Sequence, residues 1–483
     1  MHRLSNLDAS FLYLESARTP MHVGCILTFS APENGDMDFQ RVKSYINSRL
    51  PISPIFRRKL STQVLDVDRP AWIDDKGFNI DQHIFEKQLS PEAEQQQKKD
   101  LISHFFSTTL DLRRPLWEML FINKEGKNED PKPDNEFYIL LKFHHAAVDG
   151  MSAEKILSGL LSEEKTVQTK LDDSWSPVHI PLSRTVSQIT GKHIQNAYRT
   201  PTKLLGLAKR LGHSVFNSQS LRLADKRHSP PLFFMAPTTP FNRAIEKQHN
   251  FSSAHLSLIK IKEIRKAYPG STINDVVLAI CSGALRAQLD SQGELPKHPL
   301  VAMIPVSKRE KDNVEAKENG NSISPMLVSL ATNIKTAKSR LGTIHQNTLA
   351  AKKFNRDVAI ERIMKHLPSW SSSLTIKAYT HLRLANFINP VFNLIITNVP
   401  GPRTPLYLDG AELRSLEGIA PIVDGMGLTM VITSYIDTLT ISITSCESMS
   451  EQTHQLTQYL EPALEELHQE VALEDKIVPF IAA

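Results

Sequence analysis

The sequence EFYILLKFHHAAVDG, residues 136–150, begins with a run that is apolar on both faces apart from Lys142. A continuous apolar run of this length, ended by polar residues, is typical of a central strand buried on both sides. The run leads directly into His144 and His145. Because successive side chains of a strand point to opposite faces, the two histidines cannot share one role, and only one of them can face a substrate.

Three interpretations of this histidine pair compete. In the first, both imidazoles are satisfied polar groups at the end of a strand. A metal site would use the histidines with Asp149, but opposed side chains chelate poorly, and no Cys or Glu stands nearby to complete the ligands. In the third, one histidine is a general base, since an imidazole with a near-neutral pKa can take a proton from a hydroxyl and return it to a leaving group.

The composition is that of a soluble globular protein with two domains. The chain has 483 residues, of which 41% are hydrophobic and 22% charged, and this length exceeds what one ordinary core needs. The net charge of +4 is small and gives no general argument for nucleic acid. The polar N-terminus is unlike a signal peptide, and no apolar run reaches the roughly 20 residues that span a bilayer. We therefore expect a cytoplasmic protein without a nucleic-acid partner.

The order of expected strands and helices favours an α/β fold with mixed sheets in both parts of the chain. The first part has strand candidates and helical spacing at residues 21–29, 39–50, 115–123, 136–143 and 151–161. The second part has a helix, two buried strands, a hairpin and a terminal helix at residues 272–289, 300–306, 392–399, 428–446 and 454–473. We expect domains at 1–165 and 243–483, joined by a long crossover at 166–242 that prolines punctuate.

The crossover contains a basic segment, residues 184–227, in which nine Lys or Arg stand against one acid, Asp225, with leucines interleaved. Basic amphipathic segments of this kind can lie on anionic lipid surfaces. The alternative is a helix packed on the body of the protein with a solvated basic face. A peripheral contact with the inner face of a membrane or with a lipid inclusion is therefore one expectation for this segment.

Residues 144–150 have the pattern His-His-x-x-x-Asp-Gly, which resembles the signature of the coenzyme-A-dependent acyltransferase superfamily that includes chloramphenicol acetyltransferase. Shorter segments narrow the resemblance: Leu4-Ser5-x-x-Asp8-x-x-Phe11-Leu12, Pro20-Met21-His22-Val23-Gly24, Pro115-Leu116-Trp117, Asn274-Asp275 and Asn398-Val399-Pro400-Gly401-Pro402. In this order, and over nearly the whole chain, they look like the bacterial wax ester synthase/diacylglycerol acyltransferase family. Asp424-Gly425-Met426-Gly427-Leu428 departs from the plant relatives, and its glycines are expected to mark a turn.

The resemblance implies two chloramphenicol acetyltransferase-like mixed-sheet domains with the active site at their interface. His145 would be the general base, His144 would support it, and Asp149 would hold the loop through an ion pair with an arginine. Substrate binding would involve Pro115, Leu116, Trp117 and Gly150, with filling of the core as the alternative for Trp117. Asn274 is a candidate donor to the oxyanion, with a role as helix N-cap as the alternative.

The reaction implied by the resemblance is transfer of a long-chain acyl group from acyl-CoA to a long-chain alcohol or to diacylglycerol. Acyl-CoA would be a substrate, and we expect no metal and no redox cofactor. One alternative is a condensation-type enzyme that uses another acyl donor or acceptor. Another is a lipid-surface binding homologue without catalysis, although a surface binder needs none of the residues of the His-His-x-x-x-Asp-Gly pattern.

Overall fold

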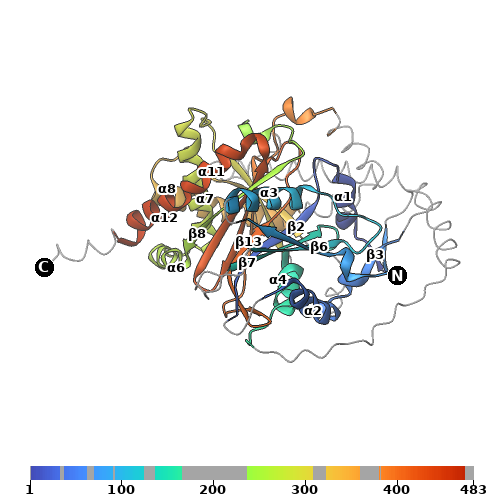
Figure 1. Ribbon diagram of the computed structural model, residues 1–483. Coiled ribbons are helices and arrows are strands. Elements are labelled where there is room, and N and C mark those ends of the chain that lie inside the picture. The colour runs from blue at the N-terminus through green and yellow to red at the C-terminus, as the bar shows by residue number, and fades with distance from the viewer. Residues whose placement is uncertain are drawn as a thin grey trace.

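The computed structural model describes residues 2–32, 37–61, 70–90, 93–124, 136–148, 150–165, 236–307, 323–358, 380 and 382–473. Within these residues the chain forms two six-stranded sheets and one three-stranded sheet, surrounded by helices (Figure 1). The basic segment 184–227 and Asp149 lie outside the described residues, so the expectations for both stay predictions.

The first sheet has the predicted strand at its centre. Its strands in spatial order are β12 (Tyr407–Leu408), β13 (Ala411–Ile419), β2 (His22–Ser30), β7 (Glu136–His144), β6 (Trp117–Lys124) and β5 (Ile84–Leu89). All neighbours are antiparallel except β5 and β6, which are parallel. Every residue of β7 after Glu136 is buried, and this confirms the prediction of a strand covered on both faces.

Helices cover the two faces of this sheet. The face of Leu140 packs against α3 (Glu94–Ser107), and the face of Ile139 packs against α2 (Phe39–Arg49) and α4 (Gly150–Leu160). Figure 1 shows α3 above the strands and α2 and α4 below them. This arrangement explains why the sequence of β7 does not alternate between apolar and polar residues, since both of its faces are core.

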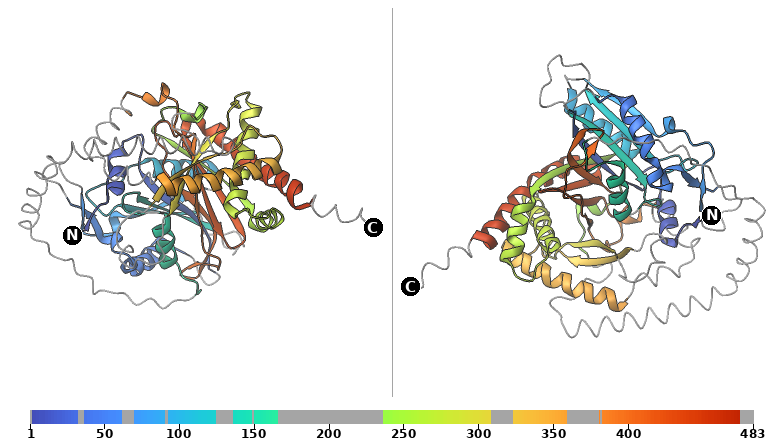
Figure 2. Two further views of the ribbon diagram at one scale, coloured as in Figure 1. Left: turned by 180° about the vertical axis from the view of Figure 1, so that it is seen from behind. Right: turned by 90° about the horizontal axis from the view of Figure 1, so that it is seen from below.

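The second sheet is also mixed. Its strands in spatial order are β10 (Ile323–Ser329), β9 (Val301–Ser307), β11 (Leu394–Val399), β14 (Leu428–Tyr435), β15 (Thr438–Cys446) and β8 (His249–Ser257). The helices whose apolar residues share its core are α6 (Leu258–Ala267), α7 (Ile273–Ser291), α8 (Ala337–Val358), α11 (Ser450–Gln458) and α12 (Leu460–His468). In Figure 2 this part of the molecule is coloured green to red, whereas the first part is mostly blue and cyan.

The expected terminal helix at 454–473 is two helices. The first ends at Gln458 and the second begins at Leu460. Pro462 gives the physical reason, because it has no N–H to donate to the carbonyl of Gln458 and its ring crowds that carbonyl. The proline is tolerated in the first turn of α12, where N–H groups have no helical partner.

The first sheet draws strands from both ends of the chain. Strands β12 and β13 come from the range 243–483, which was expected to form the second domain, yet β13 pairs with β2 from Glu412↔Ser30 to Ile419↔Gly24. Side chains of β14 then bond to β13: the Thr433 hydroxyl donates to Leu416 O (2.8 Å) and the Tyr435 hydroxyl to Leu413 O (3.0 Å). The domain bounds 1–165, 166–242 and 243–483 therefore stay a prediction. The first sheet contains strands from the first and the last of these ranges.

A three-stranded antiparallel sheet lies beside the first sheet, with β4 (Ala71–Asp74) between β1 (His2–Arg3) and β3 (Arg58–Leu60). Helix α1 (Asn6–Leu14) follows β1 directly. No helix within the described ranges combines the length and the apolar character needed to cross a bilayer.

Candidate active site

The turn that follows β7 is fixed by backbone hydrogen bonds to both neighbouring strands. His144 N donates to Leu116 O (3.0 Å), and His145 N donates to Met21 O (2.7 Å). Within the turn, Ala147 N donates to His144 O (2.8 Å). The backbone of His145 is therefore held in one place at the end of the central strand of the sheet, as an active-site base requires.

The imidazole of His145 is half-buried and stacks on the ring of Phe11 in α1. The ring centroids are 3.9 Å apart and the planes differ by 9°. A stacked aromatic partner restricts the orientation of the ring. The role of His145 as general base stays a prediction, and the stacking on Phe11 is a contact that the sequence did not reveal.

The side chain of His144 has different partners from that of His145. Its side chain is fully buried, and Ala146 N donates to its Nδ1 (3.0 Å). Its Nε2 lies 3.5 Å from Oε1 of Glu15, the C-cap of α1. His144 is thus bonded within the turn that carries His145, which suits the supporting role expected of it.

A buried lysine supports the same strand and has no role in the expectations drawn from the sequence. Lys142 Nζ donates to Phe105 O (2.8 Å) and Thr108 O (2.9 Å) at the end of α3, and it pairs with Glu118 (2.9 Å). A cation at a helix C-terminus is favourable, because the last carbonyls carry partial negative charge. Burial lowers the pKa of Lys142, while the carboxylate of Glu118 opposes this shift.

Pro115, Leu116 and Trp117 are all buried beneath the turn. Trp117 has no exposed surface, its indole N–H donates to Phe56 O (3.0 Å), and its ring stacks on His83 at 4.7 Å between centroids. These contacts fit the alternative in which Trp117 fills the core. The carbonyl of Leu116 accepts from His144 N, so the segment positions the histidine turn. Direct contact of these three residues with substrate stays a prediction.

The start of α7 corrects one expectation for Asn274. The N-cap of α7 is Thr272, whose hydroxyl accepts from Asp275 N (3.2 Å) while Asp275 accepts from Thr272 N (2.9 Å), a capping box. Asn274 is the second residue of the helix and cannot be its N-cap. Asp275 is buried and lies 3.0 Å from His345 Nδ1 in α8, so it ties the two helices together. The oxyanion role of Asn274 stays a prediction.

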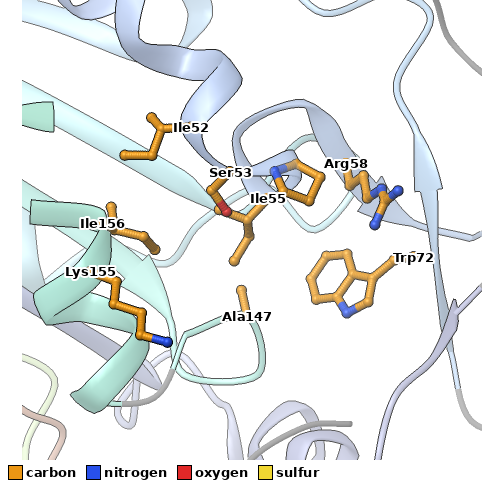
Figure 3. Close-up of a pocket in the computed structure, with 9 residues that line it drawn as sticks. Ile52, Ser53, Ile55, Arg58, Trp72, Ala147, Lys155 and Ile156 are labelled. Atoms are coloured by element: carbon orange, nitrogen blue, oxygen red, sulfur yellow. The ribbon is translucent and has the colours of Figure 1, made fainter. Parts of the chain in front are cut away.

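A cavity of about 340 Å³ opens beside the histidine turn (Figure 3). Six of its nine lining residues are apolar, and the other three are a serine and two cations. Figure 3 shows Arg58 and Lys155 on opposite sides of the cavity. The lining residues are Ile52, Ser53, Pro54, Ile55, Arg58, Trp72, Ala147, Lys155 and Ile156. Ala147 belongs to the histidine turn, and Lys155 and Ile156 belong to α4, which begins at Gly150. A cavity that borders the histidine turn and has several apolar lining residues can receive part of a hydrocarbon chain.

The turn lies where the two parts of the molecule meet. Helix α4, which follows it, contacts β11 of the second sheet. The loop after α1 also reaches the second part, since Arg18 pairs with Asp424 (3.5 Å) and donates to Thr380 O (3.0 Å). Asp424 precedes Gly425, which has φ of +83° in a tight turn closed by the pair Val423 and Met426. The expectation of a turn at 424–428 is therefore confirmed.

No three His, Cys, Asp or Glu side chains gather closely enough to hold a metal ion in the part of the chain that the structure describes.

Family models and known proteins show which family has this sequence and fold. The family model of the wax ester synthase/diacylglycerol acyltransferase catalytic domain matches residues 4–277, and that of the WS/DGAT C-terminal domain matches residues 319–468. The chain belongs to this family. A probable diacylglycerol O-acyltransferase of Mycobacterium tuberculosis is 30% identical to the chain over 474 residues, covering 96% of the chain and 98% of the relative.

Solved structures agree with this membership. The wax ester synthase/diacylglycerol acyltransferase from Marinobacter aquaeolei VT8 superposes with a TM-score of 0.66 at 25% identity, covering 97% of this chain and 99% of that one. The first condensation domain of the calcium-dependent antibiotic synthetase shares the fold, with a TM-score of 0.57 at 13% identity and coverage of 98% and 96%. The family resemblance and the mixed α/β fold class predicted from the sequence are thus confirmed. The roles of the individual site residues of this chain stay predictions.

Proposed function

We propose that the chain transfers a long-chain acyl group from acyl-CoA to the hydroxyl of a long-chain alcohol or of diacylglycerol, with His145 as the general base. Membership in the wax ester synthase/diacylglycerol acyltransferase family makes the chain an acyltransferase. The observation that supports the rest is the place of His145. Its backbone N–H donates to Met21 O, its ring stacks on Phe11, and it stands two residues before Ala147, which lines the cavity.

The reaction requires a general base and the alignment of the two substrates, because the thioester of acyl-CoA is already an activated acyl donor. An imidazole nitrogen of His145 takes the proton of the acceptor hydroxyl while the oxygen attacks the thioester carbonyl. When the tetrahedral intermediate collapses, the C–S bond breaks and the CoA thiolate takes the proton from the imidazolium. The products are an ester and CoA thiol. Such a base contributes ~10²–10⁴-fold to the rate, and holding both substrates in line contributes further.

The intermediate carries a negative oxygen that needs preorganised donors. Asn274, near the start of α7 and half-buried, remains our candidate for this role. A carboxamide N–H can donate to an oxyanion without changing protonation state. We then expect Asn274→Ala to lower kcat. An unchanged kcat would contradict the assignment of Asn274 as the oxyanion donor.

A direct test uses the purified chain with palmitoyl-CoA and either hexadecanol or dioleoylglycerol, following thiol release and the ester product. We expect His145→Ala to abolish turnover in a protein that still melts like wild type. His298, exposed and remote in sequence from the motif, provides the matched control, since His298→Ala should turn over normally. Turnover of His145→Ala within tenfold of wild type would refute the assignment of the base.

The same assay distinguishes the proposed function from the condensation-type alternative. That alternative requires turnover with an acyl group presented on a carrier-protein thiol, whereas the proposed function requires turnover with free acyl-CoA. An esterified product from palmitoyl-CoA and hexadecanol, or from dioleoylglycerol, supports the proposal and identifies the preferred acceptor. No product with either acceptor, in a chain that works with a carrier-bound donor, would favour the alternative.

The substrates give a reason for a peripheral lipid contact of the basic segment 184–227. Long-chain alcohols and diacylglycerol reside in membranes and lipid inclusions, so an acyltransferase that uses them gains by docking on anionic lipid. We expect the chain to float with vesicles that contain anionic lipid, and a variant with the Lys and Arg of 184–227 replaced by Gln to float less. Equal flotation of both proteins would exclude this segment as the anchor.

A further inference from the structure

Helix α1 contacts both histidines of the motif. It begins with a capping box between Ser5 and Asp8, and it ends at Leu14, with Glu15 as the C-cap whose N–H donates to Phe11 O (3.1 Å). Residues four apart lie on the same face of a helix, and Phe11 and Glu15 are such a pair. The ring of Phe11 stacks on His145. The carboxylate of Glu15 faces His144.

Hydrogen bonding determines which nitrogen of His144 carries the proton. Ala146 N–H donates to Nδ1 (3.0 Å), so Nδ1 presents a lone pair. In the neutral ring the proton is then on Nε2, which lies 3.5 Å from Glu15 Oε1. Both atoms are buried, and neither has a hydrogen-bond partner among the described residues. The carboxylate thus favours the tautomer that lets Nδ1 hold the backbone of the turn.

His22 lies opposite His144 across β2 and β7 but has the other tautomer. Its Nδ1 is 3.3 Å from the carbonyl of Phe106, which only accepts, so the proton is on Nδ1. Burial, and then the charge of Lys142, hold the pKa of His22 well below its usual value. A neutral ring whose Nε2 lone pair lies 3.9 Å from Glu15 gains nothing from the carboxylate. Glu15 therefore acts on His144 rather than on His22.

Glu15 is held in place from the second part of the molecule. Three residues after it, Arg18 pairs with Asp424 (3.5 Å) and donates to Thr380 O (3.0 Å), while the carbonyl of Arg18 lies 3.0 Å from His249 Nε2. Burial lowers the pKa of His249, so its ring is a neutral donor to that carbonyl. The end of α1 is thus anchored on the far side of the active-site junction.

We infer that α1 is a clamp for both histidines of the motif, in which Phe11 fixes the ring plane of His145 and Glu15 fixes the tautomer of His144. Through Nδ1 of His144 and Ala146 N–H, this tautomer holds the turn that carries the base. The inference rests on the proposed function, because it assumes that His145 is the base. Glu15, Phe11 and His144 are positioning residues in this scheme, since they act through His145.

Loss of the carboxylate has a defined consequence. The buried Nε2–H of His144 then faces no carboxylate, which removes part of the preference for the tautomer in which Nδ1 accepts from Ala146 N. The bond between Ala146 N and Nδ1 is weakened, so the turn that carries His145 loses one of the contacts that position it. Misplacement of a reacting group by about 1 Å costs on the order of 10²-fold in rate. Binding of acyl-CoA and alcohol does not depend on this bond, so the loss should fall on kcat.

The first experiment compares Glu15→Leu with Glu15→Gln in the assay with palmitoyl-CoA and hexadecanol. We expect Glu15→Leu to lower kcat by roughly 10–100-fold, with both KM values within about twofold of wild type. Glu15→Gln keeps an acceptor oxygen close to Nε2 and should recover most of kcat. Ser5→Ala is the matched control, because it weakens the same helix at its other end: it should lower the melting temperature and leave kcat unchanged.

A second experiment tests the path through His144. Glu15→Leu combined with His144→Leu should have the kcat of His144→Leu alone, because both changes break one interaction. His144→Asn places an amide oxygen where Nδ1 accepts from Ala146 and should exceed His144→Leu in kcat, a comparison that leaves Glu15 intact.

Three results would overturn the clamp: multiplicative losses in the double variant, equal kcat for His144→Asn and His144→Leu, or a kcat for folded Glu15→Leu within twofold of wild type. Failure of the proposed function has a different signature, namely turnover by His145→Ala.

Discussion

Acidification from pH 7.0 to 5.5 should lower the free energy of unfolding of this protein by about 1.2 kcal/mol through one buried side chain, His22. Burial, followed by the charge of Lys142, keeps the pKa of His22 well below its ordinary value of 6.5. The folded ring therefore stays neutral where the unfolded ring takes up a proton. Since the unfolded state binds the extra proton, stability is intact above pH 6.5 and falls as the pH drops below it.

The magnitude follows from the proton uptake of the unfolded chain. A histidine that stays neutral in the folded state costs about 0.2 kcal/mol at pH 7.0 and about 1.4 kcal/mol at pH 5.5. Burial also lowers the pKa of His83 and of His249. Each of these adds between zero and the same amount, so the three histidines together cost between about 1.2 and about 3.6 kcal/mol.

Urea unfolding at the two pH values, followed by tryptophan fluorescence, measures this cost. In His22→Asn the amide nitrogen stands where Nδ1 donates to Phe106 O, and the side chain does not titrate. The loss of stability between pH 7.0 and 5.5 should then be about 1.2 kcal/mol smaller than in wild type. His298→Asn, at an exposed histidine, should lose as much as wild type. An equal loss in His22→Asn and wild type would refute the reasoning.

Further substitutions probe the fold around the site, each measured by chemical unfolding. Thr272→Ala should cost about 1 kcal/mol, because it removes the N-cap of α7, whereas Asn274→Ala should cost less than half of that; the reverse order would contradict the cap assignment. Trp117→Phe should cost about 1–3 kcal/mol, since it leaves Phe56 O without its donor, and wild-type stability would refute this. Gly24→Ala should cost about 3 kcal/mol, because its Cβ would lie 2.2 Å from a backbone oxygen of β7; a neutral effect would show that β2 can shift.

The elements that the sequence predicted correctly are those whose own pattern carries the signal. The strand at 136–143 has a continuous apolar run, and the helix at 272–289 has a complete apolar face, so both appear within two residues of the expected bounds. The prediction of one continuous terminal helix was wrong, because Pro462 has no N–H to donate, although this proline was visible in the sequence. The pairing of β13 with β2 joins residues nearly 400 positions apart, and no local pattern encodes it.

The same distinction applies to the site. The motif located His144 and His145 at a strand end, and strand geometry gave them separate surroundings. Lys142 stood out as the one charge in an apolar strand, but only the position of the α3 carbonyls explains it. Glu15 carried no signal at all, because its partner lies 129 positions away and is reached only when α1 folds onto the turn.

The sequence by itself determined the family, the central strand and the pair of histidines, because these depend on residues that are neighbours along the chain. Only the tertiary structure decided that Trp117 lies in the core, that Thr272 rather than Asn274 caps α7, and that α1 contacts both histidines. The physical reason is that side-chain environment depends on packing between elements, which sums contacts from distant segments. A motif specifies which chemical groups are present, and the packed fold specifies what each of them touches.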